Sequence, residues 1–205
     1  RPAHMDQLHV DISVGGKNIL CDGGTFSYAS DLGNQLVRTR SHNTVAVAGK
    51  DQMAKNGHFL LYDWTERLKV HHEIRQFIGS YRTKSGYSHE RRVEFDEKGD
   101  VLIADSIILS DKKSDLEVVF HSPYAAVQNG SSVFLLDDDV PIWEIAFSEN
   151  DLIDLVVEKY EYSPLYMRCL QGTQIMARYS TKTSSAGIRT SVKLTNNMDN
   201  VVDYE

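Results

Sequence analysis

GYSHERRVEFDEKGDVLIADSIIL, residues 86–109, contains two candidate strands on either side of a short polar segment. The candidate strands are Gly86–Phe95 and Val101–Leu109, and the second is rich in isoleucine, leucine and valine. Between them, Asp96–Asp100 combines charged residues with a glycine, which is typical of a hairpin turn. The segment therefore predicts two antiparallel strands joined by a tight turn.

The same alternation of short apolar runs and turn residues continues in both directions along the chain. Further strands are expected at Leu8–Val14, Lys17–Cys21, Thr44–Ala48, His58–Trp64, Leu68–Phe77, Leu116–His121, Ser132–Leu136, Trp143–Phe147, Leu152–Tyr160, Gln174–Ser180 and Arg189–Leu194. Only Asp31–Arg40 is a candidate for a short helix, and a loop is the alternative there, because no stretch keeps a helical period beyond two turns.

So many strands exceed the roughly seven of a simple antiparallel sandwich. We expect an all-β fold made of two large stacked antiparallel sheets, a super-sandwich. Because no repeat, low-complexity tract or linker is found, residues 1–205 are interpreted as one domain.

The composition is that of a globular protein, with 41% hydrophobic and 25% charged residues. The formal net charge of −7 argues against nucleic acid as a partner. A local basic groove on such a protein could still bind a polyanionic sugar. No apolar run approaches the roughly 20 residues of a membrane span. Residues 1–4 carry no signal pattern, so we interpret the sequence as a cut or processed chain whose compartment cannot be read from this end.

The sequence has two cysteines, Cys21 and Cys169, too few for a disulfide framework. One long-range disulfide and two separate thiols are both open interpretations, and two buried thiols are the more common case.

Three candidate metal ligands occur near the start of the chain: His4, Asp22 and His42. Imidazole nitrogen and carboxylate oxygen suit zinc, but here a strand–turn–strand unit separates each ligand from the next, unlike the tight spacing of a zinc finger. The alternatives are a hydrogen-bonded strand histidine and an ordinary turn aspartate before Gly23-Gly24. Asp6 could fix the tautomer of a ligand imidazole, and Asn43 could orient a ligand or contact substrate.

Three longer blocks resemble the C-terminal domain of heparinase II/III-like proteins. The blocks are Arg1–Asp11, Ile19–Tyr28 and Arg38–Gln52. Shorter and weaker similarities follow at Phe59–Trp64, His89–Val93, Asp105–Leu109 and Phe120–His121. The most specific part is HNTV at residues 42–45 with the downstream DQ at residues 51–52.

This resemblance implies a bacterial polysaccharide lyase, periplasmic or secreted, in which an N-terminal helical toroid packs against a C-terminal β-sandwich. Such proteins cleave uronic-acid glycans, including glycosaminoglycans such as heparan sulfate, by β-elimination. The implied partners are an acidic polysaccharide and the protein's own toroid, which this chain lacks. The resemblance also implies a structural zinc ion lining the cleft, with His4, Asp22 and His42 as its ligands.

β-Elimination needs a group that neutralises the uronate carboxylate, a base, and an acid for the leaving oxygen. Tyr28 and His9 are the catalytic candidates in this chain, each with an ordinary structural role as its alternative. Arg38 and Arg40 are candidates for binding uronate or sulfate. Many relatives have a catalytic histidine where this sequence has Pro2, and the family's other catalytic residues lie mostly in the toroid. We therefore expect this chain alone to be inactive.

Two other functions are consistent with the sequence. The first is a non-catalytic glycan-binding or assembly module of a surface-polysaccharide system, which Pro2 favours. The second is a cupin-type metal enzyme, although the tight His-x-His pair of cupins is absent. Calcium at Asp137–Asp139 is a weaker alternative to zinc, because a turn between strands explains this acidic run better.

Overall fold

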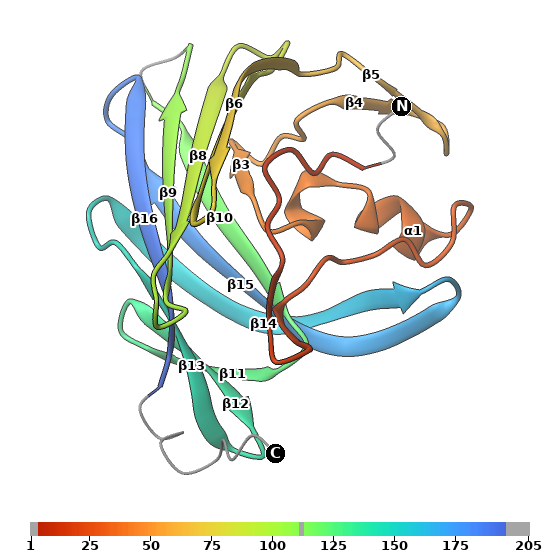
Figure 1. Ribbon diagram of the computed structural model, residues 1–205. Helices are drawn as coiled ribbons and strands as arrows, with labels where there is room; N and C mark the ends of the chain where they lie inside the picture. Colours follow the sequence, from red (N-terminus) through yellow and green to blue (C-terminus); the bar gives the residue numbers. More distant parts are fainter. Residues whose placement is uncertain (1–3, 111–112, 196–205) are drawn as a thin grey trace.

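The computed structural model describes residues 4–110 and 113–195, and its main feature is a pair of antiparallel sheets (Figure 1). The strands are β1 (Ile12–Val14), β2 (Lys17–Leu20), β3 (Val45–Val47), β4 (Ala54–Asn56), β5 (Leu60–Tyr62), β6 (Glu66–Glu73), β7 (Gln76–Arg82), β8 (Ser88–Phe95), β9 (Val101–Ile108), β10 (Asp115–Ser122), β11 (Ala125–Asn129), β12 (Ser132–Asp137), β13 (Val140–Phe147), β14 (Leu152–Leu165), β15 (Arg168–Ser180) and β16 (Ser185–Leu194). The helical elements are α1 (Asp31–Leu36) and the 3₁₀ turn η1 (Thr39–Ser41).

One main sheet has eight strands in the order β11-β12-β13-β16-β9-β8-β7-β6, and the other has four in the order β14-β15-β10-β3. Two small hairpins, β1-β2 and β4-β5, accompany them. Buried apolar side chains from both main sheets form one cluster. Phe120 of β10 and Phe147 of β13, for example, bring their ring centroids to 6.0 Å across the interior. The expected all-β, two-sheet sandwich is confirmed.

The hairpin expected at residues 86–109 is present as β8 and β9, with Phe95 paired to Val101. Asp96 stabilises its turn, because its Oδ1 accepts hydrogen bonds from the backbone N–H groups of Lys98 and Asp100. The prediction of one strand over Leu68–Phe77 is wrong. The chain reverses at residues 74–75, so that β6 and β7 form a hairpin.

Two short strands, β4 and β11, were not predicted from the sequence. β4 pairs only with β5, and β11 lies at an edge of the eight-stranded sheet, where most of its residues are exposed. Neither has the buried alternating face that makes a strand recognisable in sequence. The other expected strands are present with shifted ends, and Asp137–Asp139 contributes to the β12–β13 turn, as expected.

The segment Asp31–Arg40 contains the short helix α1 followed by η1. Ser30 caps α1, because its hydroxyl accepts a hydrogen bond from the N–H of Gly33 at 3.0 Å. A Cβ atom on residue 33 would lie 1.7 Å from the carbonyl oxygen of Ser27, so this close approach requires glycine. Within the described ranges, no helix is long and apolar enough to cross a membrane.

A buried ion pair lies on the inner face of the eight-stranded sheet. Arg91 of β8 binds Asp105 of β9 through Nε at 2.7 Å and Nη2 at 3.0 Å, and His89 Nε2 lies 2.7 Å from the same carboxylate. All three side chains are fully buried. Burial alone would raise the pKa of Asp105, but the charge of Arg91 and the hydrogen bond from His89 hold that pKa well below its usual range. Burial lowers the pKa of His89, which keeps its imidazole neutral.

Arg91 also reaches two loops outside its own sheet. Its Nη1 donates hydrogen bonds to the carbonyl oxygens of Leu8, at 2.8 Å, and of Asn43, at 2.6 Å. The eight-stranded sheet thereby fixes the backbone of two segments that carry the histidines of the N-terminal region.

We expect Arg91→Met to lower the free energy of unfolding by about 3–5 kcal/mol, because it leaves the Asp105 carboxylate buried without its cation. Urea unfolding followed by circular dichroism measures this loss. The matched control is Arg92→Met, since the neighbouring Arg92 side chain is about half exposed and should change stability by less than about 0.5 kcal/mol. Equal losses in the two variants would contradict a special contribution of the buried pair.

Candidate metal centre

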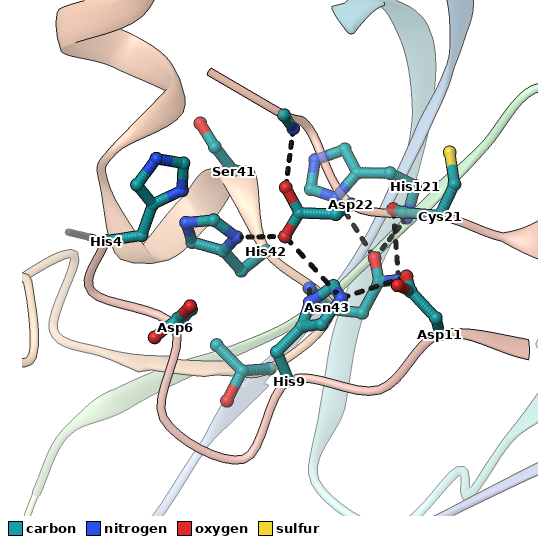
Figure 2. Close-up of polar contacts among 12 residues, drawn as sticks. His4, Asp6, His9, Asp11, Cys21, Asp22, Ser41, His42, Asn43 and His121 are labelled. Atoms are coloured by element: carbon teal, nitrogen blue, oxygen red, sulfur yellow. Dashed lines mark hydrogen bonds and ion pairs between the residues drawn. The ribbon is translucent and has the colours of Figure 1, made fainter. Parts of the chain in front are cut away.

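Three chain segments that are distant in sequence converge beside the four-stranded sheet. They are the segment before β1, the turn after β2, and the link between η1 and β3. They carry His4, Asp22 and His42 respectively. Figure 2 shows the imidazole of His42 between the imidazole of His4 and the carboxylate of Asp22.

Local backbone structure places Asp22 at this point. Its Oδ1 accepts a hydrogen bond from the N–H of Gly24 at 2.5 Å, which closes a tight turn. Gly24 has a φ of +75°, and a Cβ atom there would lie 1.9 Å from the carbonyl oxygen of Ser163 in β14. The glycine therefore lets the Asp22 turn pack directly against the four-stranded sheet.

The three predicted ligands lie close enough to share one ion. One donor atom from each of His4, Asp22 and His42 lies within 4.8 Å of the other two. His42 Nδ1 is 2.8 Å from Asp22 Oδ2, and the ring centroids of His4 and His42 are 5.1 Å apart. Zinc bonds to such donors are about 2.0–2.2 Å long, so the three donor atoms would draw closer together around a bound ion.

The electrostatics of the three side chains suit a cation. Burial, and then the neighbouring His42, lower the pKa of His4, which leaves its imidazole neutral, with a lone pair on one ring nitrogen. Burial alone would raise the pKa of Asp22, but the hydrogen bond and charge of His42 hold it well below its usual range. The donor set at neutral pH therefore contains a neutral imidazole and a carboxylate, the forms that bind metals.

One buried atom at this centre lacks a partner. His42 is fully buried, and its Nε2 has no hydrogen-bond partner in the part of the chain that the structure describes. Such an atom costs about 1–3 kcal/mol unless another group satisfies it. Two imidazoles and one carboxylate fit zinc, whereas calcium prefers a larger set of oxygen ligands. The residues present therefore fit a zinc ion.

The fully buried Asn43 side chain holds the segments behind the ligands together. Its Nδ2 donates to the carbonyl oxygens of Val10, at 2.8 Å, and Cys21, at 3.2 Å. Its Oδ1 lies 2.8 Å from the backbone nitrogen of His121 and 3.1 Å from its Nδ1, and accepts hydrogen bonds from both. Because Asn43 is buried, its role is to position these segments; it is not accessible for direct contact with substrate.

His9 lies beside the candidate ligands and is oriented from both sides. Its Nδ1 accepts a hydrogen bond from the N–H of Asn43 at 2.9 Å, so its proton is on Nε2, which donates to Asp11 Oδ1 at 2.9 Å. The rings of His9 and His42 are 5.6 Å apart and nearly perpendicular. Leu8, with a φ of +60°, lies in a turn directly before His9.

The sequence analysis did not identify His121 as part of this network. Its Nε2 lies 2.8 Å from Gln174 Nε2 and accepts a hydrogen bond from it, because His121 Nδ1 already donates to Asn43. The Tyr160 ring packs on the imidazole with a centroid separation of 4.2 Å. Burial lowers the pKa of His121 to about 3. The sequence signal that could have found it is a polar residue directly after the apolar run Val118–Phe120.

The remaining predicted site residues lie farther out. Asp6 is half-buried, and the only hydrogen bond of its side chain in the described ranges is a 3.5 Å contact from Gln7 Nε2. Arg38 pairs with Asp51, with Nη2 and Oδ2 at 2.8 Å, and Arg40 binds Glu117 through two nitrogens. Both arginines are thus engaged within the protein.

The other residues singled out in the sequence lie apart from the ligands or outside the described ranges. Tyr28 is more than half exposed and packs near Phe59 and Tyr166. Cys21 and Cys169 are separate thiols, and burial raises the pKa of Cys21 to about 12. Pro2 lies outside the residues that the structure describes.

We predict that His121 makes the folded chain less stable as the pH is lowered. Its pKa is about 3 in the folded chain and about 6.5 in the unfolded chain, so the unfolded chain takes up the proton first as the pH falls. The contribution of His121 is therefore fully present above about pH 6.5 and lost toward pH 3, at about 1.4 kcal/mol per pH unit.

His121→Gln should flatten this slope between pH 6 and 4, measured by urea unfolding with a chelator present throughout. His72→Gln, at an exposed histidine, serves as the control and should keep the native slope. Identical slopes in all three proteins would contradict the assignment.

Comparisons with known proteins support one family. A family described as "Heparinase II/III-like, C-terminal" matches residues 1–192. No curated protein matches the sequence. Among solved structures, a heparan sulfate lyase from Pedobacter heparinus has a TM-score of 0.75 at 20% identity, covering 93% of this chain and 30% of its own.

Two structures of heparinase III agree with that fold. One has a TM-score of 0.77 at 15% identity, covering 95% of this chain, and the other has a TM-score of 0.74 at 14% identity, covering 94%. The chain spans about 30% of the length of each of these proteins. The match over residues 1–192 establishes that the chain belongs to the heparinase II/III-like family and corresponds to its C-terminal domain.

Proposed function

We propose that this chain is the zinc-bearing C-terminal domain of a polysaccharide lyase that cleaves uronic-acid glycans by β-elimination. The observation that carries the proposal is the convergence of His4, Asp22 and His42, with His9 beside them, in a chain of the heparinase II/III-like family. Because the chain spans about 30% of the lyase structures it resembles, the activity belongs to the whole natural protein.

The proposed zinc ion would be held by His4, Asp22 and His42. When bound, it supplies a positive charge that holds three loops together and shapes one wall of the cleft. The chain's own residues prepare this site: the N–H of Gly24 binds the Asp22 carboxylate, and the Asn43 side chain binds the carbonyl groups of Val10 and Cys21. We assign the ion a structural role.

Among the residues of this chain, His9 is the candidate for proton transfer. Its side chain is partly exposed, and Asn43 and Asp11 hold its ring in one tautomer. The Nε2–H points to Asp11, so Nε2 is the ring atom that substrate would reach once it displaces this contact, and any proton transfer by His9 would pass through it. Tyr28 lies in an exposed group of aromatic rings, and this placement favours a substrate contact over proton transfer.

A non-catalytic glycan-binding module is the second candidate function. Both ring nitrogens of His9 are engaged in hydrogen bonds, and the sequence has Pro2 where many relatives have a histidine. A protein that lacks the proton-transfer residue would keep the loops of the candidate metal centre in place. It would then bind the glycan without cleaving it.

We expect the parent protein to carry about one zinc ion per chain, measured by inductively coupled plasma mass spectrometry after purification without chelator. His4→Ala, Asp22→Ala and His42→Ala should each abolish this binding, because each removes one of three protein ligands. His58→Ala, at a histidine outside the trio, should keep the metal. A parent protein that holds no metal and does not bind added zinc would contradict the proposed zinc site.

We expect the natural full-length protein to release unsaturated uronate products from at least one acidic glycan, detected by their ultraviolet absorbance. His9→Ala should lower kcat by about 10²–10⁴-fold and keep its zinc, as expected for loss of a proton-transfer group. His71→Ala, at an exposed histidine of β6, is the control. Glycan binding without product from the parent would instead support the non-catalytic module.

A further inference from the structure

Three aromatic side chains from separate turns form an exposed group, which we call the aromatic rim. Tyr28, Phe59 and Tyr166 are 52%, 73% and 63% exposed. The ring centroids of Tyr28 and Phe59 are 5.8 Å apart, and those of Tyr28 and Tyr166 are 6.1 Å apart. Large apolar groups that gather on a surface mark a binding site more often than single exposed residues do.

A groove with a cavity volume of about 870 Å³ adjoins the aromatic rim. Four cationic side chains line it, against the two carboxylates of Asp51 and Asp63. The cations are Arg38, Lys50, Lys55 and Lys84. In a chain whose net charge is −7, this local excess of positive charge favours an anionic ligand.

Residues that line the groove are direct chain neighbours of one rim residue and of one candidate ligand. Gly57 and His58 line the groove and directly precede Phe59, whose ring is 6.2 Å from that of His58. Met5 lines the groove next to the candidate ligand His4. In Figure 1, the β4–β5 hairpin, α1 and the end of the β14–β15 hairpin all lie on one side of the sandwich.

Some of the cations are held in place and keep hydrogen-bond donors for a ligand. Lys55 donates one hydrogen bond to Asn34 Oδ1 at 2.7 Å, and an ammonium group has three donors. Arg38 uses Nε and Nη2 to bind Asp51, so its Nη1 is not part of that contact. Both side chains are therefore pre-positioned for an anion at a small entropic cost.

We propose that the aromatic rim and this groove bind an acidic oligosaccharide. Sugar rings stack on Phe59 and Tyr166, while Lys55 and Lys84 bind carboxylate or sulfate groups. The C–H faces of a sugar ring are apolar and carry partial positive charge, so they match the negative face of an aromatic ring. Sites for such ligands combine aromatic walls with a few polar groups that fix orientation. This inference rests on the proposed function and names the residues that would hold its substrate outside the metal centre.

The test uses the natural full-length protein and isothermal titration calorimetry with three oligosaccharides: an unsulfated uronate chain, a sulfated one and a neutral one. Phe59→Ala combined with Tyr166→Ala should raise the Kd for both acidic chains about tenfold, which corresponds to about 1.4 kcal/mol. Zinc content should stay unchanged. Where the protein cleaves the ligand, KM should rise with kcat unchanged.

Matched controls separate the rim and groove from the rest of the surface. Phe95→Ala removes an aromatic side chain that is 45% exposed and lies outside the rim, and should keep the parent Kd. Lys84→Ala should weaken binding of the acidic chains and reduce its dependence on salt, whereas Lys182→Ala, outside this groove, should do neither. The neutral oligosaccharide should bind more weakly than both acidic chains.

Three outcomes would overturn the proposal: a parent that binds no acidic oligosaccharide, a double variant with the parent Kd, or a double variant that loses only thermal stability. The last result would identify the rim as a contact with another domain. Different results would refute the lyase proposal and the rim proposal. Binding through the rim without unsaturated product refutes cleavage alone, whereas cleavage with an unchanged KM in the double variant refutes the rim alone.

Discussion

The hydrogen bonds of Asn43 are the constraint on which the candidate metal centre depends. The side-chain amide has two donors and two acceptor sites, and two carbonyl groups and two nitrogens of His121 take all of them. The backbone N–H fixes His9, and the backbone carbonyl accepts from Arg91. One residue thus links the segment before β1, the end of β2, and β10 of the four-stranded sheet. Few other side chains could do so, because a carboxylate would lose both donors and an aliphatic side chain would leave all these groups unpaired.

Arg91 and Asp105 extend this constraint to the eight-stranded sheet. A buried ion pair contributes little net stability, because the two charges lose their hydration. Its value here lies in the two further donors that Arg91 directs at Leu8 and Asn43. An apolar pair of similar volume would fill the same space but leave both carbonyl groups without a partner. The candidate ligands therefore rest on contacts with both sheets, which fits a centre that must hold three loops in one geometry.

The sequence predicted the fold class and singled out His4, Asp22 and His42, which the structure brings together. The features that it did not predict were missed for physical reasons. The β8–β9 hairpin was predictable because charged residues and Gly99 interrupt two strand-like runs. The β6–β7 reversal was not, because Ile74 and Arg75 carry no turn signal. In β8, polar residues occupy both faces, so alternation cannot tell that His89 and Arg91 point inward while Glu90 and Arg92 do not. His121 was missed for the same reason: a buried histidine in a strand looks like an exposed one until its partners are known.

The metal centre and the aromatic rim differ in what each can tolerate. The side-chain and backbone polar groups of Asn43 all have specific partners, so a substitution there leaves another group unpaired and its effect spreads through the network. The rim consists of half-exposed rings on three turns, where a substitution removes contact area and little else. Under the proposed function, a change at Tyr28, Phe59 or Tyr166 would alter the contacts with the glycan without rebuilding the candidate metal centre. Specificity for sugar is then expected to vary at the rim, while the geometry of His4, Asp22 and His42 stays fixed by the sheets behind it.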